Sequence, residues 1–346
     1  MTFETIRVLV AGVGGASLGT ELLKCLRDAG RYTVFGCDVS PYAYGHYQEG
    51  VAETFLIRKE SYVESILELC RKRKIGVVVP GGEEPLRLLS ESAHKLEESG
   101  VLVAANSQRV IGICSNKALL FEALSGLGVP APRTTSIRQM SELERLESVP
   151  YPSVVKPATD TGGSRFVYLA SDPREAAVQV SYLLKNRRIA LVQEYLPLEG
   201  GEFTVGTLTL PDGRFIGSVA MRRIFDAQLS VLSRTEMGLI SSGYSQGLID
   251  DFPEVRAQAE RIAMALSSVG PLNVQGRVRA GTFMPFEINP RFSASTYLRA
   301  MAGFNELDIY LRSLLEESSP TGYRVHPGYY LRSLCELRVS EGDIKR

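Results

Sequence analysis

The stretch MPFEINPRFSAST, residues 284–296, concentrates polar side chains at the end of an apolar run. Glu287, Asn289 and Arg291 stand two positions apart, and alternate residues of a strand point to the same face. One surface therefore receives a carboxylate, an amide and a guanidinium, which are costly to bury unless they bind something. We infer a ligand-binding face at this position in the chain.

The preceding stretch, PLNVQGRVRAGTF, residues 271–283, places a second strand beside this face. Its short connection contains Gly281, which predicts an antiparallel hairpin, so Gln275 would converge with Glu287 and Asn289. Carboxylate and amide oxygens suit Mg²⁺, which keeps phosphate oxygens in its shell, and Arg291 could hold a transferring phosphoryl group. The alternative is a polar outer face, which fits poorly with the apolar residues and prolines around it.

The composition indicates a globular protein without bulk electrostatic attraction to nucleic acid or membranes. The length of 346 residues predicts two or three globular domains. The 39 Lys and Arg balance the 39 Asp and Glu, so the chain has no net charge. No apolar run approaches the ~20 residues of a membrane span, and no leader precedes the first strand. We expect a cytoplasmic protein whose five scattered cysteines are reduced packing residues, with no zinc site built on histidine.

The first 106 residues alternate predicted strands with predicted helices, which is typical of a parallel sheet in an α/β domain. The glycine stretch from Gly12 to Gly19 joins the first strand to the first helix, where Gly14 and Gly15 could direct backbone N–H groups toward an anion. It nearly matches a dinucleotide-binding pattern, but Ser17 replaces the third glycine. A tight turn, a small anionic substrate and a nucleotide all remain open.

The pattern of short strands and helices after residue 106 predicts an α+β region. A new helix is expected after Cys114 with Ser115 as its N-cap, and two further amphipathic helices are expected within residues 251–270 and 305–317. Lys117 falls in the first turn of the helix after Ser115, a position that the helix dipole disfavours unless an anion is also bound. A solvated lysine is the alternative.

Lys156 closes an apolar strand and is followed by a glycine-rich loop before Phe166. One point charge and mobile backbone amides between two strands suit a polyphosphate, although an ordinary hairpin turn would also explain them. The loop residues concerned are Gly162, Gly163 and Ser164.

Glu194 ends another predicted strand, and an irregular connection leads to Glu202 at the start of the next. Exposed backbone between Glu194 and Leu196 could pair with the edge of a purine, and Glu202 could bind ribose hydroxyls. Taken singly, each glutamate could be a surface charge.

With these motifs in this order, the sequence resembles the ATP-grasp superfamily, and most of all the stand-alone carboxylate–amine ligases that are similar to the carbamoyl phosphate synthase large chain. The resemblance extends to about residue 315, and its most specific signals are NVQ at 273–275 and FEINPRFS at 286–293. It implies a Rossmann-like domain over residues 1–114, followed by an ATP-grasp fold of two α+β subdomains, 115–195 and 196–346.

The resemblance also implies the chemistry. A small carboxylate would be activated by ATP as an acyl phosphate and joined to an amine, with two Mg²⁺ ions, for which Mn²⁺ could substitute. No nucleic acid or membrane partner is implied, and relatives include homodimers. The implied ATP ligands are Lys117, Lys156, Gly162, Gly163, Ser164, Glu194, Leu196 and Glu202; the metal ligands are Gln275, Glu287 and Asn289; and Arg291 and Lys156 would act at the reaction centre.

Some features depart from the family pattern. Phe166 replaces the last glycine of the phosphate-covering loop, which would stiffen the loop, and Glu199 competes with Glu202 for the ribose role because the spacing from Glu194 is one residue long. Two other functions therefore stay open: a carboxylase that forms carboxyphosphate, and an ATP-binding protein without turnover. An NAD-dependent oxidoreductase rests on the Gly12 to Gly19 turn alone.

Substrate contacts are expected in the segment 220–247, where relatives bind their substrates. Arg222, Arg223 and Arg234 are the candidates for an acyl phosphate or a second carboxylate, together with Gly14 and Gly15 in the N-terminal turn. Solvated arginines are the alternative interpretation.

Overall fold

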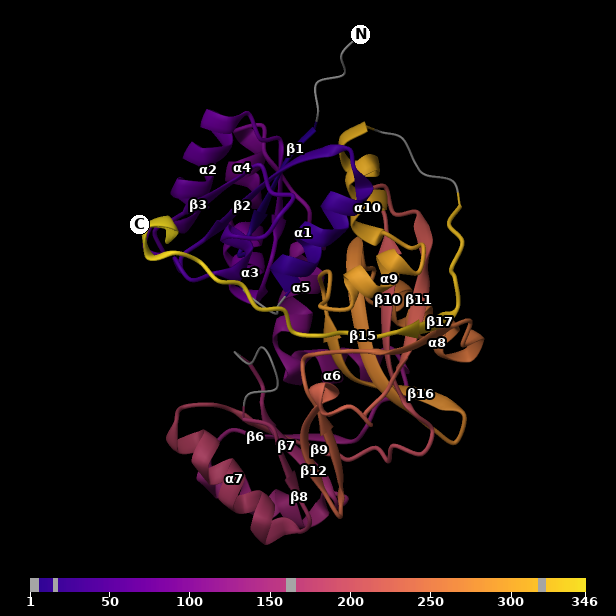
Figure 1. Ribbon diagram of the computed structural model, residues 1–346. Coiled ribbons are helices and arrows are strands. Elements are labelled where there is room, and N and C mark those ends of the chain that lie inside the picture. The colour runs from indigo at the N-terminus through magenta and orange to yellow at the C-terminus, as the bar shows by residue number, and fades with distance from the viewer. Residues whose placement is uncertain (1–5, 15–17, 160–165, 317–321) are drawn as a thin grey trace.

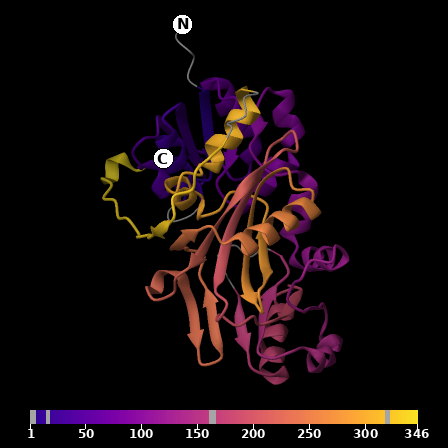
Figure 2. The same cartoon turned by 90° about the vertical axis from the view of Figure 1, so that its right-hand side faces the viewer.

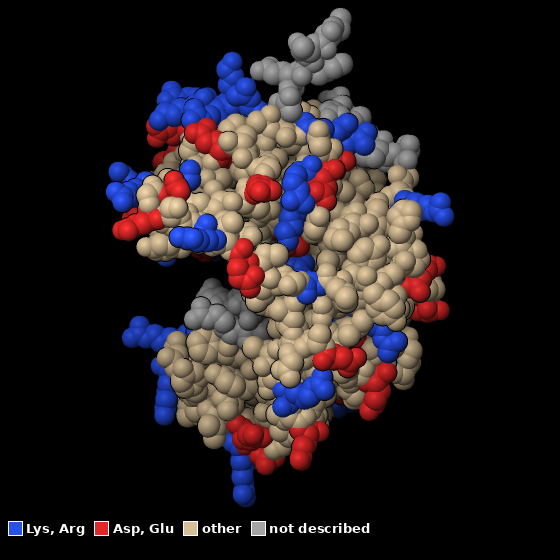
Figure 3. All heavy atoms as spheres, viewed as in Figure 1, with Lys and Arg blue, Asp and Glu red and all other residues tan. Residues whose placement is uncertain are grey.

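The computed structural model describes residues 6–14, 18–159, 166–316 and 322–346. Three sheet-centred units follow one another in Figure 1: an indigo N-terminal unit, a large sheet coloured orange, and a small magenta unit at the bottom that carries α7. The space-filling view in Figure 3 shows the molecule hollowed between the N-terminal unit and the small unit.

The N-terminal unit is a five-stranded sheet in the order β3-β2-β1-β4-β5, and every strand pair is parallel, as the alternation of strands and helices predicts. Its elements are β1 (Ile6–Ala11), α1 (Leu18–Ala29), β2 (Tyr32–Asp38), η1 (Tyr44–His46), β3 (Glu53–Leu56), α2 (Tyr62–Arg73), β4 (Val77–Pro80), α3 (Glu83–Glu91), α4 (Ala93–Glu98) and β5 (Leu102–Val103).

Both faces of this sheet are covered because the central strand is apolar on both sides. Val10 of β1 packs with Leu22 of α1 in one core cluster, whereas Leu9 packs with Ile66 of α2 in another. Buried parallel strands of this kind are continuous apolar runs.

The N-terminal glycine motif has a packing explanation. Gly12 adopts φ +96°, and a Cβ on Gly19 would lie 1.9 Å from the carbonyl oxygen of Gly12. Only a glycine lets α1 approach the turn this closely. These two glycines therefore serve the tight turn.

Two consecutive helices, α5 (Gln108–Ser115) and α6 (Lys117–Gly126), connect this unit to the next. The N-cap of α6 is Asn116, whose side-chain oxygen accepts hydrogen bonds from Ala118 N and Leu119 N. The predicted N-cap Ser115 is wrong, because Ser115 is the last residue of the preceding helix.

The small unit is a four-stranded sheet in the order β6-β9-β7-β8. Val155 and Val192 form its core with Val180 of α7. Its elements are β6 (Thr134–Ile137), η2 (Met140–Ser148), β7 (Ser153–Pro157), β8 (Tyr168–Ala170), α7 (Pro173–Lys185) and β9 (Ala190–Glu194).

The large sheet has six strands in the order β16-β15-β10-β11-β14-β17, and its pairs are antiparallel. The predicted hairpin is present: Ala280 and Gly281, with φ of 48° and 76°, connect β15 to β16, as type I′ turns require. The elements are β10 (Glu202–Thr209), β11 (Phe215–Arg223), η3 (Gln228–Ser230), β12 (Val231–Thr235), β13 (Gly238–Ser241), β14 (Gly247–Asp250), α8 (Pro253–Ala265), β15 (Gly270–Arg279) and β16 (Thr282–Asn289), with β12 and β13 forming a separate ribbon.

The C-terminal segment returns to the N-terminal unit. After α9 (Thr296–Met301) and α10 (Glu306–Glu316), the yellow chain adds β17 (Gly328–Tyr330) to the large sheet and then crosses to the indigo unit, ending beyond η4 (Glu341–Asp343) (Figures 1 and 2). There Lys345 donates a hydrogen bond to the Thr54 carbonyl.

All five cysteines are free, and four of them are buried. The fifth, Cys335, is exposed in the C-terminal segment, so the prediction that every cysteine is a packing residue is wrong for this one. Among the described helices, none has the length and apolar character needed to cross a membrane.

Candidate functional site

A cleft between the small sheet and the large sheet brings together eight of the thirteen predicted site residues that the structure describes. It encloses about 1100 Å³ of space, part of it open to solvent, and both sheets contribute walls. Clefts between packed units are common ligand sites. The predicted residues along it are Lys117, Lys156, Glu194, Leu196, Gln275, Glu287, Asn289 and Arg291.

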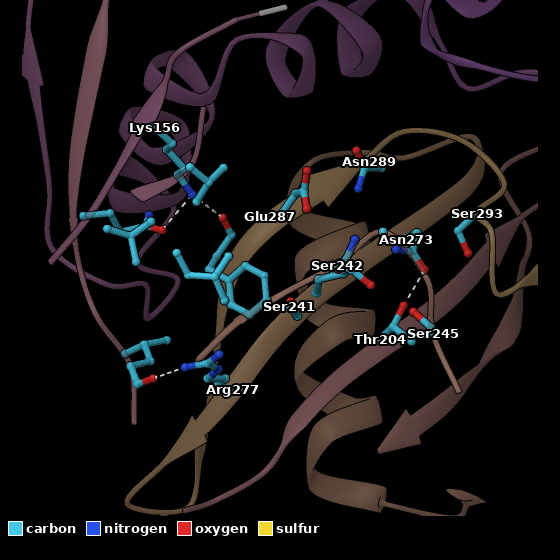
Figure 4. Close-up of a pocket in the computed structure, with 18 of the residues that line it drawn as sticks. Lys156, Thr204, Ser241, Ser242, Ser245, Asn273, Arg277, Glu287, Asn289 and Ser293 are labelled. Atoms are coloured by element: carbon cyan, nitrogen blue, oxygen red, sulfur yellow. Dashed lines mark hydrogen bonds between the residues drawn. The ribbon is translucent and has the colours of Figure 1, made fainter. Parts of the chain in front are cut away.

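The β15–β16 hairpin forms one wall. Its register pairs Gln275 with Glu287 and Asn273 with Asn289, and a bulge follows Gln275. Figure 4 shows Glu287 and Asn289 side by side at the end of β16. No hydrogen bond or ion pair occupies the Glu287 carboxylate within the described part of the chain. This wall therefore presents free oxygen donors to the cleft.

Lys156 lies on the opposite wall, at the end of β7, and its ammonium reaches across the cleft. Nζ donates hydrogen bonds to Gln193 Oε1 at 2.8 Å and to the carbonyl oxygen of Phe286 at 2.9 Å. Figure 4 shows it facing the Glu287 wall. Lys117, the first residue of α6, adds a second cation to the same cleft.

Burial first, and then the Lys117 charge, lower the pKa of Lys156 from 10.5 to about 7, against an opposing effect of Glu287. Near neutral pH the side-chain amine of Lys156 is thus only partly protonated. An anion bound between the two lysines would favour the charged form, because an opposite charge stabilises it.

Arg291 reaches the cleft by a different route from the one its spacing predicts. Strand β16 ends at Asn289, so strand alternation does not extend to Arg291. Its guanidinium instead forms an ion pair with Glu83, at the start of α3 in the N-terminal unit, and donates to the Phe292 carbonyl at 2.9 Å. Desolvation alone would raise the pKa of Glu83, but the Arg291 charge and hydrogen bonds lower it.

Asn273 is a cleft residue that the sequence analysis missed. It is 2% exposed, and its Oδ1 accepts hydrogen bonds from Thr204 Oγ1 at 2.9 Å and from Arg299 Nη1 at 3.5 Å. Its amide nitrogen has no partner among the described residues, so the two N–H groups remain as donors for a ligand oxygen. Its position two residues before Gln275, on the same strand face, was the available signal.

The other neutral polar residues of the cleft lining were also missed. Four are serines in two loops that close the end of the cleft beyond Asn289, namely Ser242, Ser245, Ser293 and Ser295, and irregular backbone of this kind carries no periodic signal in the sequence. The missed residues are Gln193, Thr204, Ser241, Ser242, Ser245, Ser293 and Ser295, several of which are labelled in Figure 4.

The other end of the cleft contains the connection after β9. Glu194 forms an ion pair with Arg279 and accepts from Arg133 N at 3.2 Å. The Leu196 carbonyl accepts from Arg277 Nη1 at 2.6 Å, whereas the Leu196 amide has no hydrogen-bond partner in the described chain. This amide is therefore an unused hydrogen-bond donor at the cleft.

Glu202, the predicted ribose ligand, is buried and is not among the residues that line the cleft. Its side chain is 0% exposed, and its two oxygens accept hydrogen bonds from Arg223 Nη1 and Arg277 Nε, each at 2.9 Å. Both oxygens are thus already used by buried cations. We correct the expectation: in this structure Glu202 is the centre of a buried ion-pair cluster.

The three candidate substrate arginines do not line the cleft either. Arg223 is 4% exposed and donates to the carbonyls of Ser242 and Tyr244, at 2.9 and 2.6 Å. Arg222 and Arg234 are exposed and line a second cavity, to which the β12–β13 ribbon also contributes. None of the three is therefore among the residues that line the cleft.

The loop residues Gly162, Gly163 and Ser164, and also Gly15, lie outside the described residues. Gly14 is described and follows the Gly12 turn at the end of β1. Phe166 has φ 58°, a left-handed conformation that favours glycine, and its ring lies 6.3 Å from that of Tyr182. The backbone at Phe166 thus keeps a glycine-type conformation despite the aromatic side chain.

Two family models match the chain. An ATP-grasp domain matches residues 114–295, more than half of the chain, and a PylC-like N-terminal domain matches residues 8–104. The protein belongs to the ATP-grasp family, as the sequence motifs indicate.

Curated relatives with similar sequences are carbamoyl phosphate synthase large chains. The enzyme of Sulfolobus acidocaldarius is 26% identical over 359 residues, which cover 98% of this chain and 31% of that protein. That of Haemophilus ducreyi is 28% identical over 257 residues, 71% of this chain and 22% of that protein. The chain thus spans less than a third of these relatives.

Solved structures share the fold, which confirms the predicted fold class. The N5-carboxyaminoimidazole synthetase of Staphylococcus aureus complexed with ADP has a TM-score of 0.68 at 16% identity, covering 94% of this chain and 82% of that one. The L-amino acid ligase of Bacillus licheniformis has a TM-score of 0.67 at 14% identity, covering 90% and 74%.

Proposed function

We propose that the protein is an ATP-dependent ligase that activates a small carboxylate as an acyl phosphate and joins it to an amine, releasing ADP and phosphate. The observation that carries the proposal is the opposition of Glu287, with free oxygens, to Lys156 across one cleft. Cations and metal-binding oxygens on facing walls suit a polyphosphate. The names of the carbamoyl phosphate synthase and L-amino acid ligase relatives agree with C–N bond formation.

Mg²⁺ would be held by Gln275, Glu287 and Asn289, which are hard oxygen donors. The described residues include no group of three or more His, Cys, Asp or Glu suited to a metal. One carboxylate and two amides therefore fit ions whose other ligands are phosphate oxygens. When bound, two such ions (or Mn²⁺ in their place) would neutralise the triphosphate charge and orient it.

The chain's own residues bind and orient the nucleotide. The Leu196 amide and Glu194 would hold the adenine edge, and Lys117 and Lys156 would bind phosphate oxygens. Lys156 would take up a proton as it does so, because the phosphate charge raises its depressed pKa. The loop 162–164 is a further proposed phosphate contact, and Glu202 is not a ribose ligand in this proposal.

The reacting carboxylate would lie between the phosphate and the serine-lined end of the cleft. An oxygen of that carboxylate attacks the γ-phosphorus, the bond to the ADP oxygen breaks, and the acyl phosphate forms. Arg291 and the Asn273 amide would donate hydrogen bonds to the oxygens on which negative charge accumulates. The amine then attacks the acyl carbon, phosphate leaves with the bonding electron pair, and the amine nitrogen loses one proton to solvent. Gly14 and Gly15 remain proposed substrate contacts; Arg222, Arg223 and Arg234 do not.

The test is an ADP-release screen with Mg²⁺ and pairs of carboxylates and amines, amino acids first, followed by mass spectrometry of the product. Wild type is expected to release ADP only with a productive pair and to form an amide of the summed mass less water. ADP release that persists unchanged in Glu287→Gln would show that the metal assignment is wrong.

A carboxyphosphate-forming activity is the second candidate, because the carbamoyl phosphate synthase and carboxyaminoimidazole synthetase names both imply carboxylation chemistry. ADP release that depends on bicarbonate, without any organic carboxylate, would favour it. ATP binding with no turnover across the whole panel would instead favour a non-catalytic ATP-binding protein. Cytoplasmic location, homodimer formation and the boundaries 1–114, 115–195 and 196–346 stay predictions.

A further inference from the structure

The C-terminal segment inserts one side chain into the body of the molecule beside the cleft. Its residues around position 332 are mostly exposed, with Leu331 68% and Leu334 51% accessible. Arg332 is the exception, because its side chain is only 7% exposed. A buried guanidinium is retained only where its donors find partners.

The Arg332 guanidinium finds partners in three separate parts of the fold. Nη2 forms an ion pair with Glu21 Oε2 of α1 at 2.8 Å, and it also donates to the Ala294 carbonyl. Nε donates to the Ser245 carbonyl at 3.2 Å. The backbone N–H of Arg332 donates to Gln246 Oε1, also at 3.2 Å.

Two of these partners belong to the wall of the cleft. Ser245 and Ala294 lie in the two serine-rich loops that close the end of the cleft beyond Asn289. Neither loop is held there by strand pairing, since β13 ends at Ser241 and β16 ends at Asn289. Arg223 also holds the first loop, through the carbonyls of Ser242 and Tyr244, but the side chain of Arg332 contacts both loops.

The third partner connects the wall to the N-terminal unit. Glu21 is 3% exposed in the first turn of α1, where it also accepts a hydrogen bond from Lys24 at 2.8 Å. Buried ion pairs are costly to break, because the remaining charge loses its partner. Arg332 thus joins α1 and both loops at one point.

We propose that Arg332 is a positioning residue that fixes the end of the cleft where the non-nucleotide substrates bind. None of its described partners belongs to the connection 194–196 or to the two lysines of the nucleotide end. Its loss should therefore weaken binding of the carboxylate or amine and leave ATP binding unaffected. The assignment of this end of the cleft to the non-nucleotide substrates rests on the proposed ligase function. The contacts that Arg332 makes with α1 and the two loops do not depend on that function.

The kinetic test compares Arg332→Gln with Arg338→Gln, a matched change at an exposed arginine of the same segment. Arg332→Gln is expected to raise KM for the carboxylate or amine by about 10-fold and to change KM for ATP by less than about 2-fold. Arg338→Gln is expected to match wild type. Arg332→Lys, which can still reach Glu21, should recover part of the loss. Equal changes in both KM values would indicate a general structural effect and overturn the proposal.

A second measurement does not need turnover. Hydrogen exchange followed by mass spectrometry should show about 10-fold faster exchange in peptides covering 242–247 and 292–296 in Arg332→Gln, with no change in Arg338→Gln. If Arg332→Gln does not fold, Arg332→Lys is expected to show a smaller increase in the same peptides. Unchanged exchange in a folded variant overturns the proposal. If wild type releases no ADP with any substrate pair, the ligase function fails while the exchange result still decides the role of Arg332.

Discussion

Two glutamates of the same six-stranded sheet have opposite surroundings. Glu287 on β16 faces the cleft, and no hydrogen bond or ion pair involves its carboxylate in the described chain. Glu202 on β10 is 0% exposed, and its oxygens are shared between Arg223 and Arg277, which are 4% exposed. Both glutamates follow an irregular or apolar stretch at one end of a strand, so the sequence alone hardly distinguishes them.

The difference shows that a carboxylate is available for function only while its oxygens are free. Arg277 also donates to the carbonyls of Leu196 and Leu239, at 2.6 and 2.7 Å. Through its ion pair with Arg277, Glu202 stabilises the wall of the cleft without itself lining the cleft. Glu287, which holds nothing in the protein, has its lone pairs available for a metal ion.

The largest expected effect is a loss of activity that distinguishes Glu287 from Glu202. Glu287→Gln should lower substrate-dependent ADP release by about 10⁴-fold, because the only carboxylate of the metal wall is lost. The free energy of unfolding should change by less than about 1 kcal/mol, since no partner is left unpaired. Steady-state kinetics and urea unfolding measure the two quantities. Glu254→Gln, at an exposed position, is the control; an equally inactive Glu254→Gln would contradict the assignment.

Glu202→Gln should have the reverse profile. It leaves two buried guanidinium groups without a full counter-charge, so the free energy of unfolding is expected to fall by about 3–5 kcal/mol. The exposed Glu199→Gln should change it by less than about 0.5 kcal/mol. Urea unfolding provides the comparison. A fully stable Glu202→Gln with a raised KM for ATP would restore the ribose role.

Lys156→Met tests the proposed role of the cleft in binding the nucleotide phosphates. ADP release is expected to fall by about 10²-fold, because one of the two phosphate-facing cations is lost. At pH 8, where the depressed pKa of about 7 leaves Lys156 mostly neutral, nucleotide binding to wild type should take up about one proton. Calorimetry in buffers of different ionisation enthalpy detects this uptake. Uptake that persists in Lys156→Met would assign the proton to another group.

The same pKa predicts a pH dependence of stability. The pKa of Lys156 is lower in the folded protein than its ordinary 10.5, so the unfolded chain binds more protons between about pH 7 and 10.5. The contribution of this group to stability therefore rises with pH through that range. In Lys156→Met the rise between pH 7 and 9 should be smaller than in wild type, as urea unfolding can measure.

The smallest expected effect concerns Glu83, whose side chain is 45% exposed in its ion pair with Arg291. Glu83→Gln should change the free energy of unfolding by less than about 1 kcal/mol, because solvent screens such pairs. The KM for the carboxylate substrate is expected to fall by about 3-fold, since Arg291 loses a competing anion. A rise in KM would instead mean that Glu83 orients Arg291.

Several features of the cleft follow from local sequence. The alternation of Gln275, Glu287 and Asn289 with apolar neighbours, and the Ala280–Gly281 turn, predict the hairpin that the structure contains. The parallel N-terminal sheet likewise follows from alternating strand and helix patterns. Period and turn chemistry are local properties, so a single sequence can reveal them.

Other features required contacts between distant residues. The pairing of Arg291 with Glu83 spans 208 positions, that of Arg332 with Glu21 spans 311, and that of Arg277 with Glu202 spans 75. No spacing rule connects such residues, because the separation along the chain does not determine which side chains meet. Asn273 lay close enough to Gln275 to be found, but the orientation of its amide depends on Thr204, a neighbour on another strand.

By itself, the amino-acid sequence determined the kinds of elements, the two-sided apolar strands, and the face on which oxygen donors and cations gather. Only the tertiary structure decided which charged groups are already neutralised within the protein, as for Glu202, and which are left for a ligand, as for Glu287. The physical reason is that secondary structure depends on residues a few positions apart, whereas the free energy of a charged side chain depends on every group that surrounds it after folding.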